Sequence, residues 1–143
     1  MEKTPQPVEE FLEGVTPRKR RNDAERLLPL FARATGETPT MWGTIIGFCE
    51  YHYRYASGHE GDAPAASFAP RRAATTIYLF DGVSAYPGEL ARLGPHTTGV
   101  GCLYVKDLDG IDLGVLEDVV AASYRAVTWG TFGRGAHDGA ASG

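Results

Sequence analysis

The chain has 143 residues, of which 43% are hydrophobic and 22% are charged, so it is long enough to fold as one compact domain without a metal or a disulfide. The formal net charge of -4 argues against a general binder of nucleic-acid backbones, which requires a basic face. No apolar run approaches the ~20 residues that span a bilayer, and the first ten residues lack the apolar segment of a secretion signal. We therefore expect a cytoplasmic protein that binds neither nucleic acid nor membrane.

Two helices are predicted before the first strand. Apolar residues recur at helical spacing in residues 8–14, and Thr16 and Pro17 then supply an N-cap and a first-turn proline for a longer helix. Pro29 lies inside this second segment, so we expect a kink or two shorter helices there. The basic run at residues 18–21 is expected to be a solvated helix start.

Residues 41–62 alternate like a long strand and then enter a glycine-rich turn. Tyrosines two residues apart fit the pleated surface of a strand, and the opposite face is apolar early and charged late. A second extended run at residues 65–70 completes a predicted hairpin. The predicted tyrosine face consists of Gly47, Cys49, Tyr51, Tyr53 and Tyr55.

The second half of the chain predicts two more strands, a short helix and a closing helix that Asp112 caps. These elements are expected at residues 74–80, 84–93, 102–106 and 112–127. Residues 131–143 are rich in glycine and alanine and predict a disordered tail, which leaves residues 1–130 as one domain. The order of elements predicts the α+β class, with a mainly antiparallel sheet and helices packed on it.

Several short motifs occur in an order that resembles the YdhG-like domain family. They are the Trp-Gly pair at Trp42, residues 45–48, the spaced tyrosines, the Ser57-Gly58 turn, residues 68–72 and residues 101–106. The resemblance covers residues 8–124 and implies an α+β fold. At least one bacterial member is described as a frataxin-like iron chaperone, so the resemblance also implies weak iron binding. The chain departs from the family where an aromatic residue usually follows the turn, at Ala63 and Pro64, and at two loop lysines, at Thr97 and Val100.

Acidic and imidazole side chains gather in the predicted hairpin. Oxygen-rich sites with one or two imidazoles suit ferrous iron or manganese, held weakly and exchangeably. The sequence therefore predicts no tightly bound cofactor and a candidate Fe(II) site, with solvated hairpin side chains as the alternative. The candidate metal ligands are Glu50, His52, His59, Glu60 and Asp62.

A different hypothesis is an interaction module or a binding protein for a small anion. Arg71 and Arg72 follow a predicted strand, and their guanidinium groups suit carboxylate or phosphate recognition. A surface turn explains the two arginines equally well. With the aromatic residues, the candidate ligand-binding set is Trp42, Tyr51, Tyr53, Tyr55, Arg71 and Arg72.

No phosphate loop, zinc-protease helix or Cys-x-x-Cys pair occurs in the chain, so we expect a binding protein, with an enzyme as the least favoured class. Cys49 and Cys102 lie in predicted strands among apolar residues and are expected to be structural thiols. Whether they are oxidised, and whether the chain is a monomer or a homodimer, stays open at this point.

Overall fold

The computed structural model describes residues 1–54 and 56–129, and within them it contains six antiparallel strands in the order β1-β2-β3-β4-β6-β5 and four α-helices. The predicted α+β class is confirmed. The helices are α1 (Val8–Glu13), α2 (Arg18–Thr35), α3 (Pro87–Ala91) and α4 (Leu113–Thr128). The strands are β1 (Pro39–Trp42), β2 (Ile45–Arg54), β3 (Glu60–Pro70), β4 (Thr75–Tyr78), β5 (Thr97–Thr98) and β6 (Cys102–Val105). Tyr55 and the predicted tail lie outside the described residues.

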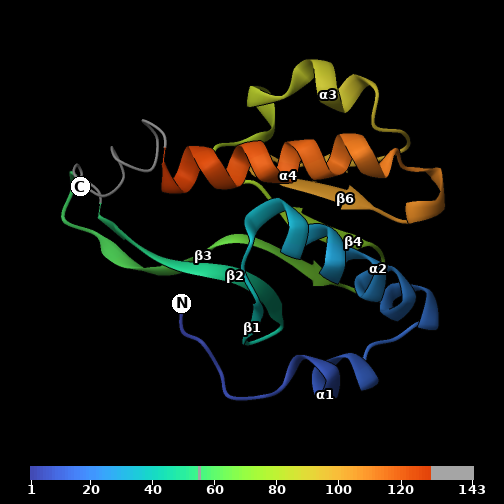
Figure 1. The fold of residues 1–143 in the computed structure, drawn as a ribbon, viewed down its shortest axis with the longest axis horizontal. Coiled ribbons are helices and arrows are strands. Elements are labelled where there is room, and N and C mark those ends of the chain that lie inside the picture. Colours follow the sequence, from blue (N-terminus) through green and yellow to red (C-terminus); the bar gives the residue numbers. More distant parts are fainter. Residues whose placement is uncertain (55, 130–143) are drawn as a thin grey trace.

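Helices α2 and α4 lie side by side on one face of the sheet, and both contact β3 (Figure 1). Helix α1 packs near β1 and the start of α2, whereas α3 lies on the outer side of α4. The far ends of β2 and β3 project from the body of the molecule as a hairpin. Within residues 1–54 and 56–129, no helix is both long and apolar enough to cross a membrane.

The core lies between α2, α4 and the sheet. Three fully buried phenylalanines form its centre: the ring of Phe31 on α2 is 5.4 Å from that of Phe48 and 4.9 Å from that of Phe68. Aromatic pairs at these separations add to the free energy gained by burying their surface. The helix therefore binds two neighbouring strands through one side chain.

The helix predictions agree with the structure in most places. Gly14 follows α1, and the side chain of Asp112 accepts a hydrogen bond from the Val115 amide at 3.1 Å, as expected of an N-cap. Helix α2 continues through Pro29 as a single helix, with the proline on the exposed side. The predicted N-cap of α2, Thr16, is wrong by one residue: Pro17 occupies the N-cap position, and its side chain cannot accept a hydrogen bond.

The alternation of β2 shifts by one residue at Cys49, contrary to the predicted tyrosine face. A Cβ on Gly47 would lie 2.5 Å from the Cβ of Pro64, so these two residues share a face, and Pro64 pairs with Glu50. In a regular strand, positions 47 and 50 face opposite sides. Cys49 has a φ of 67°, which produces the shift. The tyrosines of β2 therefore continue the face of Phe48.

The left-handed backbone at Cys49 predicts an unusual mutational pattern. Cys49→Val should destabilise the fold by about 2 kcal/mol, because a β-branched residue is strongly disfavoured at positive φ. Cys49→Gly should cost less than Cys49→Val, since glycine adopts this conformation freely. Urea denaturation of both variants measures the difference, and a valine variant as stable as the glycine variant would contradict the assigned backbone.

Candidate functional site

The sheet face opposite α2 and α4, called the open face because neither of these helices covers it, still has buried side chains at Ser67, Ala69 and Thr76. Its side chains form a row across five strands, Thr40, Gly47, Ser67, Tyr78 and Cys102, in which each residue pairs with the next. A second row places Ala69, Thr76, Tyr104 and Thr97 beside one another. Small residues thus occupy the middle strands of this face. The two tyrosines of these rows, Tyr78 and Tyr104, lie on β4 and β6, toward the other edge of the sheet.

A pocket of about 450 Å³ lies at this edge. Most of its lining surface is apolar, and among the described residues the lining combines one lysine that makes no ion pair with a few hydrogen-bonding groups, as ligand pockets generally do. The lining residues are Ala74, Pro95, His96, Thr97, Tyr104, Lys106, Asp107 and Gly110. From the sequence, His96 beside Lys106 and Cys102 is a candidate group of low weight. The other lining residues come from separate segments that no spacing pattern joins.

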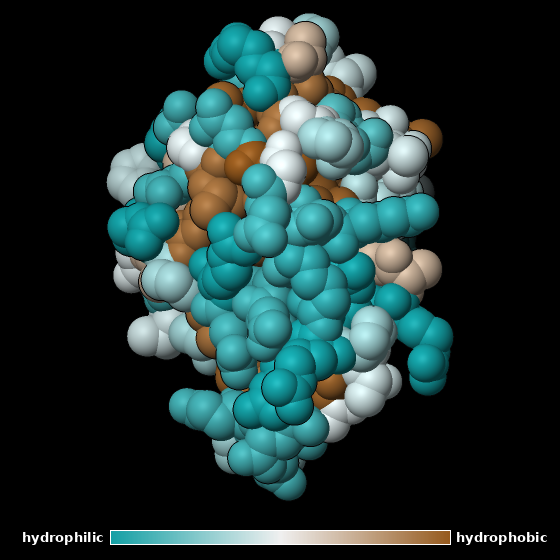
Figure 2. Space-filling model, turned by 90° about the vertical axis from the view of Figure 1, so that its right-hand side faces the viewer, coloured by the Kyte–Doolittle hydropathy of each residue, from teal (hydrophilic) through white to brown (hydrophobic). Residues whose placement is uncertain are grey.

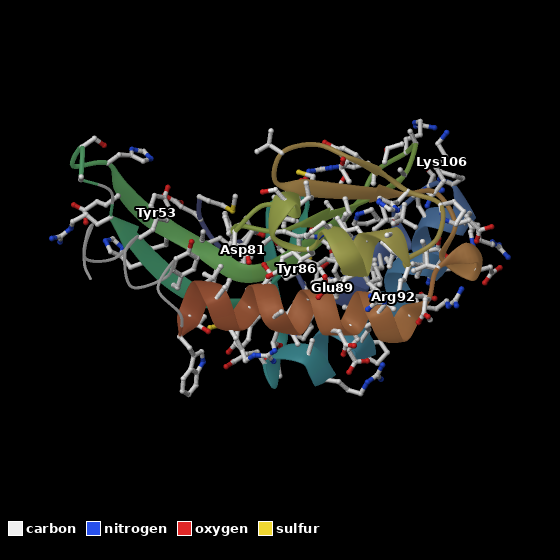
Figure 3. The ribbon with its side chains drawn as sticks, turned by 90° about the horizontal axis from the view of Figure 1, so that it is seen from above. Tyr53, Asp81, Tyr86, Glu89, Arg92 and Lys106 are labelled. Atoms are coloured by element: carbon white, nitrogen blue, oxygen red, sulfur yellow. The ribbon has the colours of Figure 1, made fainter. Side chains whose placement is uncertain are left out.

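Lys106 is the cation of the pocket. Its side chain is exposed and makes no ion pair within the described residues. In Figure 3, Lys106 lies on the side of β6 away from α4. Ala74, the residue directly before β4, is its neighbour, because the register pairs Thr75 with Val105. The ammonium group therefore stands beside an apolar patch without a counter-ion.

Two further side chains supply hydrogen bonds. The Nδ1 of His96 lies 2.7 Å from the Gly94 carbonyl oxygen, which can only accept, so this nitrogen carries a hydrogen and Nε2 is outside that bond. The neighbouring Cys102 side chain raises the pKa of Tyr104. The phenol of Tyr104 is thus neutral at physiological pH and can donate.

The pocket wall at residues 106–109 is fastened to α2 by buried charges. Asp23, whose side chain is 1% exposed, lies 2.9 Å from the Lys19 ammonium and accepts a hydrogen bond from the Leu108 amide at 3.3 Å. Arg20, which is also buried, donates to the Lys106 carbonyl at 2.8 Å. Lys19 in turn lies 2.7 Å from Asp107. This contact raises the pKa of Lys19 and lowers that of Asp107.

The predicted solvated basic run is therefore only partly solvated. Figure 2 views the end of the molecule where α2 begins and β6 ends, and hydrophilic side chains cover the middle of this surface. Within the run, Arg20 is buried and Lys19 is bound to two carboxylates, whereas Arg21 forms an exposed ion pair with Glu25. The run serves to hold the pocket wall.

Removing the buried carboxylate should have a large effect. Asp23→Ala leaves the buried guanidinium of Arg20 without its counter-ion and the Leu108 amide without its acceptor, so we expect a loss of about 3 kcal/mol in the free energy of unfolding. Glu25→Ala, on the same helix, is the control and should change stability little because its ion pair is exposed. Chemical denaturation compares the two, and equal effects would contradict the role of Asp23.

The two candidate arginines have different environments. The Arg71 guanidinium donates to the Thr44 hydroxyl at 2.7 Å and to the Tyr78 hydroxyl at 3.2 Å, so it spans the open face across β3. Arg72 is exposed and makes no ion pair within the described residues. The turn that carries both arginines closes with a hydrogen bond from the Arg71 amide to the carbonyl of Ala74, a pocket residue.

The candidate aromatic residues are not gathered at one site. Trp42 is 4% exposed and its indole lies against Gly47 on the open face. Tyr51 and Tyr53 are half-buried on the hairpin, and the ring of Tyr51 contacts that of Phe80 at 5.9 Å, edge to face. Trp42 and these tyrosines therefore lie on opposite faces of the sheet.

Three of the five candidate metal ligands come together on the hairpin. His52 Nε2 lies 2.7 Å from Glu60, and His52 Nδ1 lies 2.8 Å from Asp62. A carboxylate only accepts, so two ionised carboxylates at the two ring nitrogens favour the imidazolium form, in which both nitrogens donate. The two carboxylates stand at different edges of the ring, so a single ion at either nitrogen would reach only one of them.

The other two candidates lie apart from this cluster. Glu50 forms an ion pair with Lys3 at 2.7 Å, and the ring of His59 packs 5.7 Å from that of Tyr53. Within residues 1–54 and 56–129, no group of three or more histidine, cysteine, aspartate or glutamate side chains is arranged to hold a metal ion. The donors present do not fit a closed, multidentate site.

The hairpin charges predict a pH dependence. Hydrogen bonds to two carboxylates raise the pKa of His52, with Asp62 contributing most and Glu60 next. His52 in turn lowers the pKa of Glu60. The contribution of His52 to stability is therefore complete below its unfolded pKa of ~6.5 and is lost as pH rises through its higher folded pKa. The contribution of Glu60 is present above its unfolded pKa and is lost as pH falls through its lower folded pKa.

NMR titration of the His52 ring protons measures this directly. The midpoint should lie above ~6.5, and Asp62→Asn should lower it. A midpoint at or below 6.5 in the unaltered protein would show that the two carboxylates do not hold the imidazolium.

A buried polar cluster on the helix side was not predicted. Asp81 accepts hydrogen bonds from the Tyr86 hydroxyl and, at 2.7 Å, from the Ser123 hydroxyl on α4. Figure 3 shows Asp81 and Tyr86 beside α4. Burial, together with Asp81, raises the pKa of Tyr86, so its phenol stays protonated. The cluster fastens the segment before α3 to the closing helix.

Both cysteines are free thiols. They stand on β2 and β6, which are separated by β3 and β4, so they cannot form a disulfide with each other in this fold. Burial raises the pKa of Cys49, which makes its thiol unreactive at neutral pH.

Comparison with protein-family models, curated proteins and solved structures gives no match to this chain. The site therefore has to be interpreted from its own geometry.

Proposed function

We propose that the protein is a non-enzymatic binding protein for a small anionic ligand and that the pocket beside β6 is its site. The observation that carries the proposal is the placement of Lys106, a cation without a counter-ion, in the wall of an apolar pocket of about 450 Å³. An ammonium group beside apolar surface attracts an anion more strongly than one surrounded by water does.

The neighbouring groups support the same ligand charge. Arg72 makes no ion pair within the described residues and lies in the turn that closes on Ala74, although it is not part of the lining. The only acid in the lining, within the described residues, is Asp107, whose carboxylate lies 2.7 Å from the Lys19 ammonium. Thr97 and Tyr104 offer hydroxyl donors, which orient a bound carboxylate or phosphate.

Weak ferrous iron binding, which the family resemblance implies, stays a prediction with less support. Iron coordination by His52 requires a neutral imidazole, whereas both of its nitrogens donate to carboxylates. Any iron would have to displace a proton and one of the two hydrogen bonds. Anaerobic calorimetry with Fe(II), on the unaltered protein and on Asp62→Asn, tests this separately from the anion site.

The anion proposal predicts that Lys106→Gln weakens binding at least about tenfold, or ~1.4 kcal/mol, because the variant keeps the shape of the pocket and removes its charge. A thermal-shift screen of monocarboxylates, dicarboxylates and inorganic phosphate identifies binding anions, and calorimetry then measures their affinity. Lys3→Gln is the control, since Lys3 is an exposed lysine paired with Glu50 and lies outside the pocket. The absence of binding by every anion, or equal effects of the two variants, would contradict the proposal.

A further inference from the structure

We propose that the pocket beside β6 takes a planar aromatic monocarboxylate in preference to a small inorganic anion or a dianion; this inference rests on the function proposed above. It is carried by the size of the pocket, by the flat apolar groups in its wall and by the balance of charge around Lys106.

Size is the first argument. A volume of about 450 Å³ falls in the range of pockets that enclose whole organic ligands, roughly 300 to 1,000 Å³. Acetate or inorganic phosphate would leave most of that space to water. Only a ligand with an apolar body replaces the water at Ala74, Pro95 and Tyr104, and the release of that water favours binding.

The second argument is shape. The rings of Tyr104 and Pro95 present flat apolar groups to the pocket, and aromatic rings favour offset or edge-to-face contacts with a ring such as that of Tyr104. The Tyr104 hydroxyl lies over Gly99, where a Cβ would be 3.1 Å away, so the ring stands beside a position that carries no side chain. A planar ring therefore matches this wall better than a flexible chain of similar volume.

The third argument is charge. Lys106 supplies one positive charge in the lining, and the next residue, Asp107, brings a carboxylate to the same wall. Lys19 lies 2.7 Å from Asp107 and 2.9 Å from Asp23, so one ammonium group serves two carboxylates and offsets the charge of Asp107 only in part. One anionic group is thus matched by Lys106, whereas a second anionic group would meet the Asp107 carboxylate. The pocket favours a monoanion.

Calorimetry on the full chain with five named probes separates these arguments. Benzoate should bind at least about tenfold more tightly than acetate or inorganic phosphate, because only benzoate fills the apolar wall. Hexanoate, which has an apolar but non-planar body, should fall between benzoate and acetate. Terephthalate, which adds a second carboxylate to the same ring, should bind more weakly than benzoate.

Matched variants assign the preference to its residues. Tyr104→Leu, which loses both the ring and the hydroxyl, should lower benzoate affinity about tenfold more than acetate affinity. Tyr104→Phe loses only the hydroxyl donor and should retain the preference for benzoate over acetate. Asp107→Asn should reduce the discrimination against terephthalate. Tyr53→Leu, on the hairpin and outside the pocket, is the control. In the unaltered protein, benzoate should shift the amide signals of Thr97 and Lys106 and not that of His52, which gives a readout independent of any variant.

The outcomes are distinguishable. If acetate and phosphate bind through Lys106 as tightly as benzoate, the aromatic inference is overturned and the anion-binding function stands. If no probe binds, or if benzoate shifts only signals outside the pocket, both are overturned.

Discussion

The buried carboxylate of Asp23 is the interaction on which the pocket depends. It comes from the first turns of α2, and it is the counter-ion of Lys19 and Arg20 and the acceptor of the Leu108 amide. A carboxylate removed from water is tolerated only when charges and hydrogen bonds of this kind surround it. Through these contacts the segment after β6 is fixed to a helix that is itself held by the phenylalanine core. Contacts within the chain therefore hold Lys106 and Asp107 in position.

Much of the fold follows from periodicity. The stripe of apolar residues on α2, the capping aspartate before α4 and the glycine-rich turn after β2 each act locally, so the sequence alone predicts their positions. The exception within the hairpin is Cys49. Its φ of 67° is not indicated by a pattern of alternating residues, because that pattern assumes regular extended backbone. The predicted tyrosine face was wrong for that reason. Strand β1 was also missed, since it was taken as part of β2.

The candidate sites were harder to predict because they depend on pairing across the fold. Charge and residue type placed His52, Glu60 and Asp62 in one candidate site, and the hairpin register makes these residues neighbours. The same information does not tell a metal site from an ion-paired imidazolium. The difference lies in which ring nitrogen faces which carboxylate. The pocket beside β6 joins residues 74, 95–97, 104, 106, 107 and 110. Most of these residues become neighbours only when β4 and β6 pair.

The two faces of the sheet thus have different roles. One face holds the core, while the other carries small side chains and borders the pocket beside β6, whose wall is held by contacts with α2. Hydrogen exchange at the Leu108 amide in the free protein tests this preformed wall most directly. If Asp23 holds the segment, this amide should exchange as slowly as the amides of β6, only when the domain unfolds. Exchange as fast as that of the exposed Val100 loop would contradict a preformed pocket.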